Sequence, residues 1–148
     1  MGVNRVTVRK ADVNVRALLT ALTHASPVKV GYPYETTGRV IHDMANVPIA
    51  TLAAWHELGT EDMPPRPFMR QGAMKMVARR GLLVPHVKRL VSGKTHVDRF
   101  MITMGMILKQ SIESAVAEQK FAPLAPATVA AKGSTEILVD TGEMLDNL

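Results

Sequence analysis

The sequence predicts an α+β fold in which two or three helices pack on a small mixed sheet. Three observations predict it. One stretch, at about 95–119, carries a continuous apolar face at helical spacing. Two other stretches, 28–32 and 46–58, are rich in the residue types that strands prefer. The composition, with 47% apolar and 21% charged residues over 148 positions, is that of one globular domain.

The chain is expected to begin with three short elements. Residues 1–10 mix charges with valines, which indicates a short strand or a flexible arm. A helix follows, capped by Asp12 or Asn14 and stopped before Pro27, because proline disfavours helical geometry in the residue before it. Its apolar stripe consists of Val15, Leu18, Leu19 and Leu22. Residues 28–32 alternate and are β-rich, which predicts a strand.

The middle of the chain leaves two interpretations open. Residues 46–58 are apolar at nearly every position, and such a run fits either a buried strand or a short helix. The residues that favour a strand are Val47, Ile49, Thr51 and Trp55, whereas the alanines favour a helix. We interpret the stretch as a strand that ends at Gly59.

A proline-rich connection comes next. Three prolines within residues 63–67 fix the backbone and remove three N–H donors, which predicts a stiff, extended surface segment. Pro67 suits the first position of a helix that runs to about Arg80. The residues expected to face inward on this helix are Phe68, Met69, Ala73, Met76 and Val77. Those expected to face outward are Arg70, Lys75, Arg79 and Arg80.

The second half is dominated by the long amphipathic helix at 95–119. A looser region, 81–93, precedes it, and Thr95 resembles the first residue of a capping box. The apolar face of the helix consists of Val97, Phe100, Met101, Met104, Leu108, Ile112, Ala115 and Val116. In the tail, residues 137–139 are a strand candidate. We therefore expect one domain over 1–148, with a flexible arm at 1–10 and a tail at 133–148.

Composition excludes several classes of site. The chain has no cysteine, which rules out a disulfide scaffold, a Cys-based zinc site, an iron–sulfur cluster and a thiol nucleophile. The net charge of +5 is compatible with nucleic acid, an anionic surface or an acidic protein as partner. No signal-peptide run or membrane-length apolar run is visible, so we expect no membrane association.

His56 and Glu57 are the first candidates for chemistry, since zinc proteases place these residue types side by side on a helix. That motif needs a second histidine four residues after the first, and position 60 is Thr60. The remaining histidines have no ligand-type neighbour at helical spacing. We therefore predict no catalytic residue, metal or cofactor, and interpret His56 and Glu57 as the end of a strand, in which one of them hydrogen-bonds the following turn.

A basic cluster is the second candidate. It consists of Arg79, Arg80, Lys88, Arg89 and Lys94, with His86 among them. These side chains could follow a phosphate backbone without sequence preference. Aromatic residues for base stacking are absent nearby, so a solvated face or a contact with an acidic partner subunit is the better interpretation.

Two stretches together resemble the neck and tail-completion proteins of long-tailed bacteriophages. The first is IATLAAWHELGT at 49–60 with MPPRPFMR at 63–70, and the second is PLAPATVAAKG at 123–133 with LVDTGEML at 138–145. The family usually has Phe at the position of Leu58 and Ser at that of Ala125. The resemblance covers about a third of the chain.

The resemblance implies a small α+β structural protein of the virion that is not an enzyme. It would form a homo-oligomeric ring, expected to be sixfold, at the head–tail junction, after assembly in the cytoplasm of the host bacterium. Its neighbours would be other neck, connector and tail proteins, with transient contact to DNA passing through the lumen. The residues that the resemblance places at subunit interfaces are Trp55, His56, Glu57, Gly59, Thr60, Pro64, Pro65, Arg66, Pro67, Phe68, Arg70, Asp140, Thr141 and Gly142.

Two functional hypotheses follow. The first is the structural ring subunit, in which the stiff proline segment and the side chains of Arg66 and Arg70 meet a neighbouring copy. The alternative is a small basic nucleic-acid-binding module that uses residues 79–94.

Overall fold

The protein is mostly helical. The computed structural model describes residues 15–33, 47–139 and 143–148. The described elements are α1 (Val15–Thr23), α2 (Ile49–Leu58), α3 (Phe68–Ala78), the 3-10 helix η1 (Arg80–Leu83), α4 (Val84–Val91), α5 (Val97–Ala117), α6 (Pro126–Lys132) and α7 (Glu143–Asp146). Within these ranges the backbone forms no strand, only a single bridge residue at Pro48. The predicted α+β fold with a small mixed sheet is therefore wrong.

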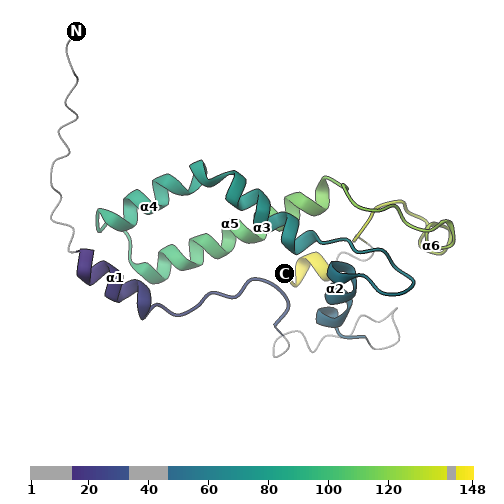
Figure 1. The fold of residues 1–148 in the computed structure, drawn as a ribbon, viewed down its shortest axis with the longest axis horizontal. Coiled ribbons are helices and arrows are strands. Elements are labelled where there is room, and N and C mark those ends of the chain that lie inside the picture. The colour runs from purple at the N-terminus through teal and green to yellow at the C-terminus, as the bar shows by residue number, and fades with distance from the viewer. Residues whose placement is uncertain (1–14, 34–46, 140–142) are drawn as a thin grey trace, which may run out of the picture.

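A helical hairpin forms the body of the molecule. α3, η1 and α4 follow one another along one side, and α5 returns beside them (Figure 1). α5 matches the long amphipathic helix predicted from its apolar face. α3 and α5 approach closely at Gly72, where an added Cβ would lie 2.4 Å from Cγ1 and 2.5 Å from Cα of Ile112. Lys75 joins the same two helices, because its Nζ donates to the carbonyl oxygen of Ser114 at 3.2 Å and also pairs with Glu118.

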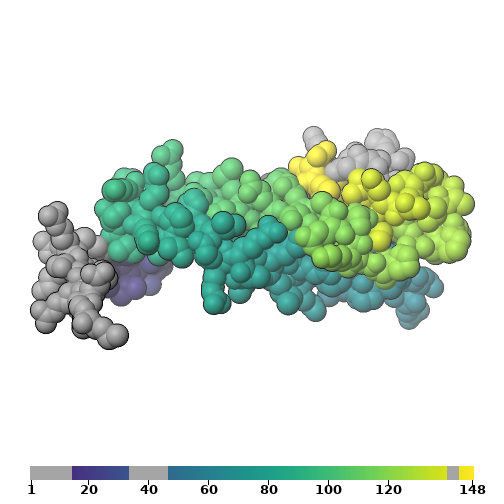
Figure 2. Space-filling view, turned by 90° about the horizontal axis from the view of Figure 1, so that it is seen from above, coloured from purple at the N-terminus to yellow at the C-terminus, as the bar shows by residue number. Residues whose placement is uncertain are grey.

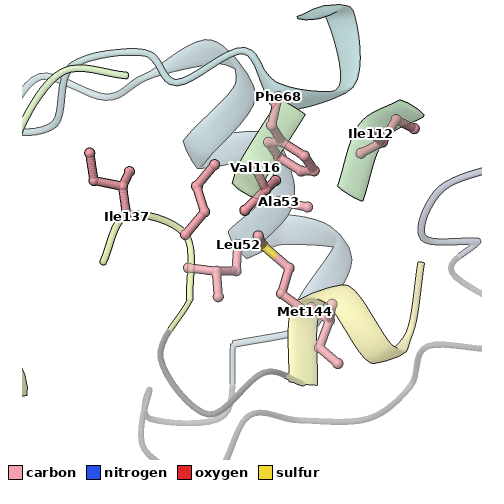
Figure 3. Packing of buried hydrophobic residues seen from close by; sticks show 9 residues of the cluster. Leu52, Ala53, Phe68, Ile112, Val116, Ile137 and Met144 are labelled. Atoms are coloured by element: carbon pink, nitrogen blue, oxygen red, sulfur yellow. The ribbon is translucent and has the colours of Figure 1, made fainter. Parts of the chain in front are cut away.

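The core lies where α2, the start of α3, the end of α5 and the tail meet. Figure 3 shows side chains from all four segments converging there. The largest fully buried side chains are Phe68, Ile49, Ile112 and Val116. Ile137, Leu138 and Met144 of the tail complete the cluster. Segments far apart in the sequence are thus held together mainly by the burial of apolar area.

The molecule is elongated, with different elements at its two ends (Figures 1 and 2). α1 and α4 lie toward one end, and α2 and α6 lie toward the other. Residues 24–33 run from α1 along α5, and Val28 packs so closely on Gly105 that an added Cβ there would lie 2.7 Å from Cγ1 of Val28.

The three strand predictions fail for different reasons. Residues 28–32 have no strand beside them in the described chain and lie on the helix α5. Residues 49–58 are the helix α2, in which Ile49, Leu52 and Ala53 bury one face at helical spacing. Residues 137–139 are irregular, and the backbone of Ile137 pairs with the side chain of Gln119, just after α5, and not with a neighbouring strand.

Two helix predictions also need correction. The looser region expected at 81–93 contains α4, which tolerates Pro85 because a proline in the first turn leaves no helical hydrogen bond broken. On α3 the inward face holds Phe68 and Gly72, while Ala73 and Val77 are exposed. Lys75, expected to face outward, is directed to α5 instead. The predicted arm at 1–10 lies outside the described residues.

Candidate functional site

The candidate site is the segment that we call the elbow, residues 56–68, which links α2 to α3. α2 ends at Leu58, and the residue after it is Gly59, whose N–H donates to the carbonyl of Trp55 at 2.8 Å and whose φ is +80°. A tight turn follows, in which the N–H of Thr60 donates to the carbonyl of Met63 at 2.9 Å. An added Cβ at Gly59 would lie 3.0 Å from both the Met63 oxygen and the Pro65 nitrogen. This turn therefore requires glycine both for its positive φ and for space.

Glu57 connects the end of α2 to the beginning of α3. Its Oε2 accepts from the N–H of Met69 at 2.9 Å, and its Oε1 accepts from the N–H of Arg70 at 3.1 Å. The first N–H groups of a helix have no partner within the helix, and they favour a negative charge nearby. Pro67, the residue before α3, provides no side-chain cap. Glu57 therefore acts as a cap supplied from another helix.

Arg66 is directed into the molecule. Its side chain is 3% exposed, and burial lowers the pKa of its guanidinium from the usual value. Nε donates to the carbonyl of Ala122 at 3.1 Å, and one terminal nitrogen donates to the carbonyl of Pro123 at 3.2 Å. The Arg66 backbone N–H also donates to the carbonyl of His56. Arg66 thus fixes the elbow against the segment that follows α5.

His56 is half-buried beside this arginine. Burial, and then the positive charges of Arg66 and Lys132, lower the pKa of its imidazole to about 4. Its Nδ1 is buried and has no hydrogen-bond partner among the described residues. At neutral pH His56 is therefore an uncharged side chain of the elbow interior.

The motif residues divide into an inner and an outer set. Arg66 and Phe68 are buried, and the carboxylate of Glu57 is bound to the first N–H groups of α3. The exposed members are Trp55, Thr60, Pro64, Pro65 and Arg70. Residues 140–142, which are Asp140, Thr141 and Gly142, lie outside the described residues. The prediction that His56 and Glu57 end a strand and that one of them hydrogen-bonds the following turn is wrong, because the element is the helix α2 and Glu57 accepts from the beginning of α3 and not from the turn.

The basic cluster lies on the η1–α4 side of the hairpin. Arg79 follows α3, Arg80 begins η1, Lys88 and Arg89 lie on α4, and Lys94 lies in the turn after it. All five side chains are exposed. None of them forms an ion pair with another residue in the part of the chain that the structure describes.

Sequence reasoning missed Gln119. Its Nε2 donates to the carbonyl of Ile137 at 3.0 Å, and its Oε1 accepts from the N–H of Ile137 at 2.6 Å. One amide side chain thus satisfies both backbone groups of a buried residue in the tail. No spacing in the sequence links positions 119 and 137, so no pattern could have revealed this contact.

The described residues contain no group of three or more His, Asp or Glu that could hold a metal ion. No helix in the same ranges has the length and apolar character needed to cross a membrane. Comparison with known protein families, with curated proteins and with solved structures finds no match to the chain.

Proposed function

We propose that this chain is a non-enzymatic structural subunit that assembles as a homo-oligomeric ring at the head–tail junction of a long-tailed bacteriophage. The observation that carries the proposal is the distribution of apolar side chains. In the described residues, fourteen large apolar side chains are exposed, whereas eleven apolar residues are buried. Monomeric soluble proteins rarely expose contiguous apolar patches, and such patches mark contact surfaces.

Two sets of the exposed apolar residues each follow one helical face. On α1 they are Val15, Leu19 and Leu22, and on α4 they are Val84, Val87 and Val91. Each set repeats at the three- and four-residue spacing of one helical face. A helix that presents such a face stabilises an assembly when a partner covers it.

The elbow supports the same function. Gly59, Glu57 and Arg66 fix its backbone from inside, and Pro64 and Pro65 are presented on the surface. A segment that is already rigid loses little conformational entropy when a neighbour docks on it. The resemblance of residues 49–70 and 123–145 to neck and tail-completion proteins indicates which assembly this would be.

The mass of the full-length protein in solution tests the ring. Sedimentation velocity and native mass spectrometry are expected to show a closed oligomer, and image averages of phage particles are expected to show it between head and tail. A protein that stays monomeric at all concentrations and is absent from finished particles would contradict the proposal.

Nucleic-acid binding is the second candidate. The exposed, unpaired basic side chains at 79–94 favour it. It predicts salt-dependent retention of DNA that is lost when Lys88 and Arg89 are both replaced by Glu. Absence of DNA binding at low salt would exclude it.

A further inference from the structure

One end of the molecule carries a basic and apolar surface on α4, which we call the arm patch. Val84, Val87 and Val91 are each more than 40% exposed and share one helical face, next to the buried Leu90. Lys88 borders this stripe, four residues after Val84 and three before Val91, whereas Arg89 lies on the other side of the helix, about 140° or more around it from each valine. The arm patch is therefore an apolar stripe with a cationic edge.

The charge of the arm patch is not balanced locally. The sequence has no acidic residue between Asp62 and Asp98. Lys88 and Arg89 form no ion pair with any described residue. A partner for this patch must therefore bring both carboxylates and apolar side chains.

The other end carries such a surface, which we call the elbow patch. Trp55 is 40% exposed and Leu58 is 70% exposed, on the side of α2 away from the buried Ile49. Glu61 and Asp62 follow directly in the exposed turn of the elbow. The elbow patch is an apolar surface with an anionic edge.

We propose that the arm patch of one copy docks on the elbow patch of the next, so that identical subunits join head to tail. This inference rests on the proposed ring and names its mating surfaces. α4 and α2 lie toward opposite ends of the elongated molecule (Figure 1). Two different, complementary patches at opposite ends give a heterologous contact, which forms a ring when the rotation closes.

Charge also selects this pairing over the others. Two arm patches would place Lys88 against the same cation, and two elbow patches would oppose Glu61 and Asp62 to themselves. A nucleic acid would satisfy the cations but would leave the valine stripe exposed to water. A second copy satisfies both parts of each patch.

Trp55 provides a direct readout, because it is the only tryptophan in the chain and lies on the elbow patch. We would titrate the full-length protein and follow its Trp55 emission together with its sedimentation. The emission is expected to shift to shorter wavelength as the oligomer forms. In the Lys88→Glu/Arg89→Glu variant, which leaves the elbow patch unchanged, we expect association at least ~10-fold weaker and no shift at the same concentrations.

Restored pairing is the stronger test. Glu61→Lys/Asp62→Lys alone is expected to be as defective as the arm variant. The variant with all four substitutions is expected to associate again, because the charges of both patches are reversed together. Lys29→Glu/Lys120→Glu makes the same charge change at two exposed positions outside both patches and is expected to associate like the wild type.

The outcomes separate this inference from the ring proposal. A wild type that forms a ring while Trp55 emission stays constant, or while the arm variant still assembles, would overturn the docking and leave the ring intact. If the arm variant keeps its ring but loses DNA retention, the arm patch serves nucleic acid and the docking is again overturned. A wild type that never associates overturns both.

Discussion

The carboxylate of Glu57 holds the beginning of α3 through two backbone N–H groups. Replacing Glu57 by Ala leaves both groups without this partner. We expect the free energy of unfolding to fall by about 1 kcal/mol, the usual value of a helix cap. Denaturant unfolding, followed by circular dichroism, measures it. Glu136→Ala is the matched control, because Glu136 is exposed, and it should change little. Equal losses in the two variants would contradict the capping role.

His56 makes stability depend on pH. Its pKa is about 4 in the folded protein against an ordinary value of 6.5, so the unfolded state binds more protons between these values. The contribution of His56 is complete above pH 6.5 and is lost as pH falls toward 4. The loss is at most about 1.4 kcal/mol per pH unit within that window.

The His56→Gln variant isolates this effect. It cannot take up the proton, so its stability is expected to fall less steeply with acidification than that of the wild type. Unfolding midpoints at several pH values between 4 and 7 provide the comparison. Parallel pH profiles for the two proteins would show that the imidazole is not held uncharged by its surroundings.

At the scale of elements, the contact between α3 and α5 depends on the missing side chain of Gly72. A methyl group there would overlap the backbone of Ile112, which cannot move away as a flexible side chain could. We expect Gly72→Ala to destabilise the protein by about 1–3 kcal/mol, as overpacking of a core does.

Gly81 is the matched control for that prediction, because an added Cβ there meets nothing within 4 Å. Gly81→Ala is expected to be neutral or to stabilise by up to about 1 kcal/mol through the unfolded chain. Thermal or denaturant unfolding compares the two variants. If Gly72→Ala were as well tolerated, the helices would not be as close as described.

Gln119 connects the tail to the end of α5. Gln119→Ala leaves the backbone N–H and C=O of Ile137 without their partner, which costs about 1–3 kcal/mol if both remain buried. If the tail instead opens locally, water satisfies these two groups. In both cases the N–H of Ile137 loses its partner, so its hydrogen exchange is expected to accelerate. Gln110→Ala, at an exposed position of α5, is the control and should leave exchange in the tail unchanged.

The elements show which parts of the fold the sequence could reveal. α5 was predictable because its polar and apolar faces differ over more than five turns. α2 was not, because it is apolar nearly all round and β-branched residues suggested a strand. α4 lies in the region predicted to be looser, because it is short and contains Pro85, which a helix accepts only in its first turn.

The elbow was predictable as a connection without helix but not in its contacts. Three prolines predicted an extended segment after Gly59, and residues 64–67 belong to no helix or strand, but Pro67 turns the chain, with φ −75° and ψ 67°. The internal positions of Arg66 and Glu57 depend on partners at 122–123 and 69–70. Such long-range pairs have no signature in local spacing, so an arginine expected to meet a neighbouring copy instead binds within its own subunit.

On the scale of the whole molecule, the sequence revealed the excess of positive charge but not its separation in space. Basic residues without acidic neighbours gather on the hairpin from 63 to 97. Glu61 and Asp62 are adjacent to this stretch in sequence, yet the length of α3 and η1 separates the elbow from α4 (Figure 1). The fold thus gives the two ends of the molecule different charges.

This separation predicts how salt should act on self-association. Lys88, Glu61 and Asp62 are exposed, so their attraction across a contact is screened as the Debye length falls from about 10 Å at 0.1 M salt to about 3 Å at 1 M. The valine stripe is not screened in this way. Sedimentation across a salt series is therefore expected to show association that weakens several-fold with salt but is not abolished. Val87→Ser should weaken association at every salt concentration, because it removes apolar area and leaves the charges in place. Association that strengthens steadily with salt would instead indicate a purely apolar contact, in which the two charged edges do not meet.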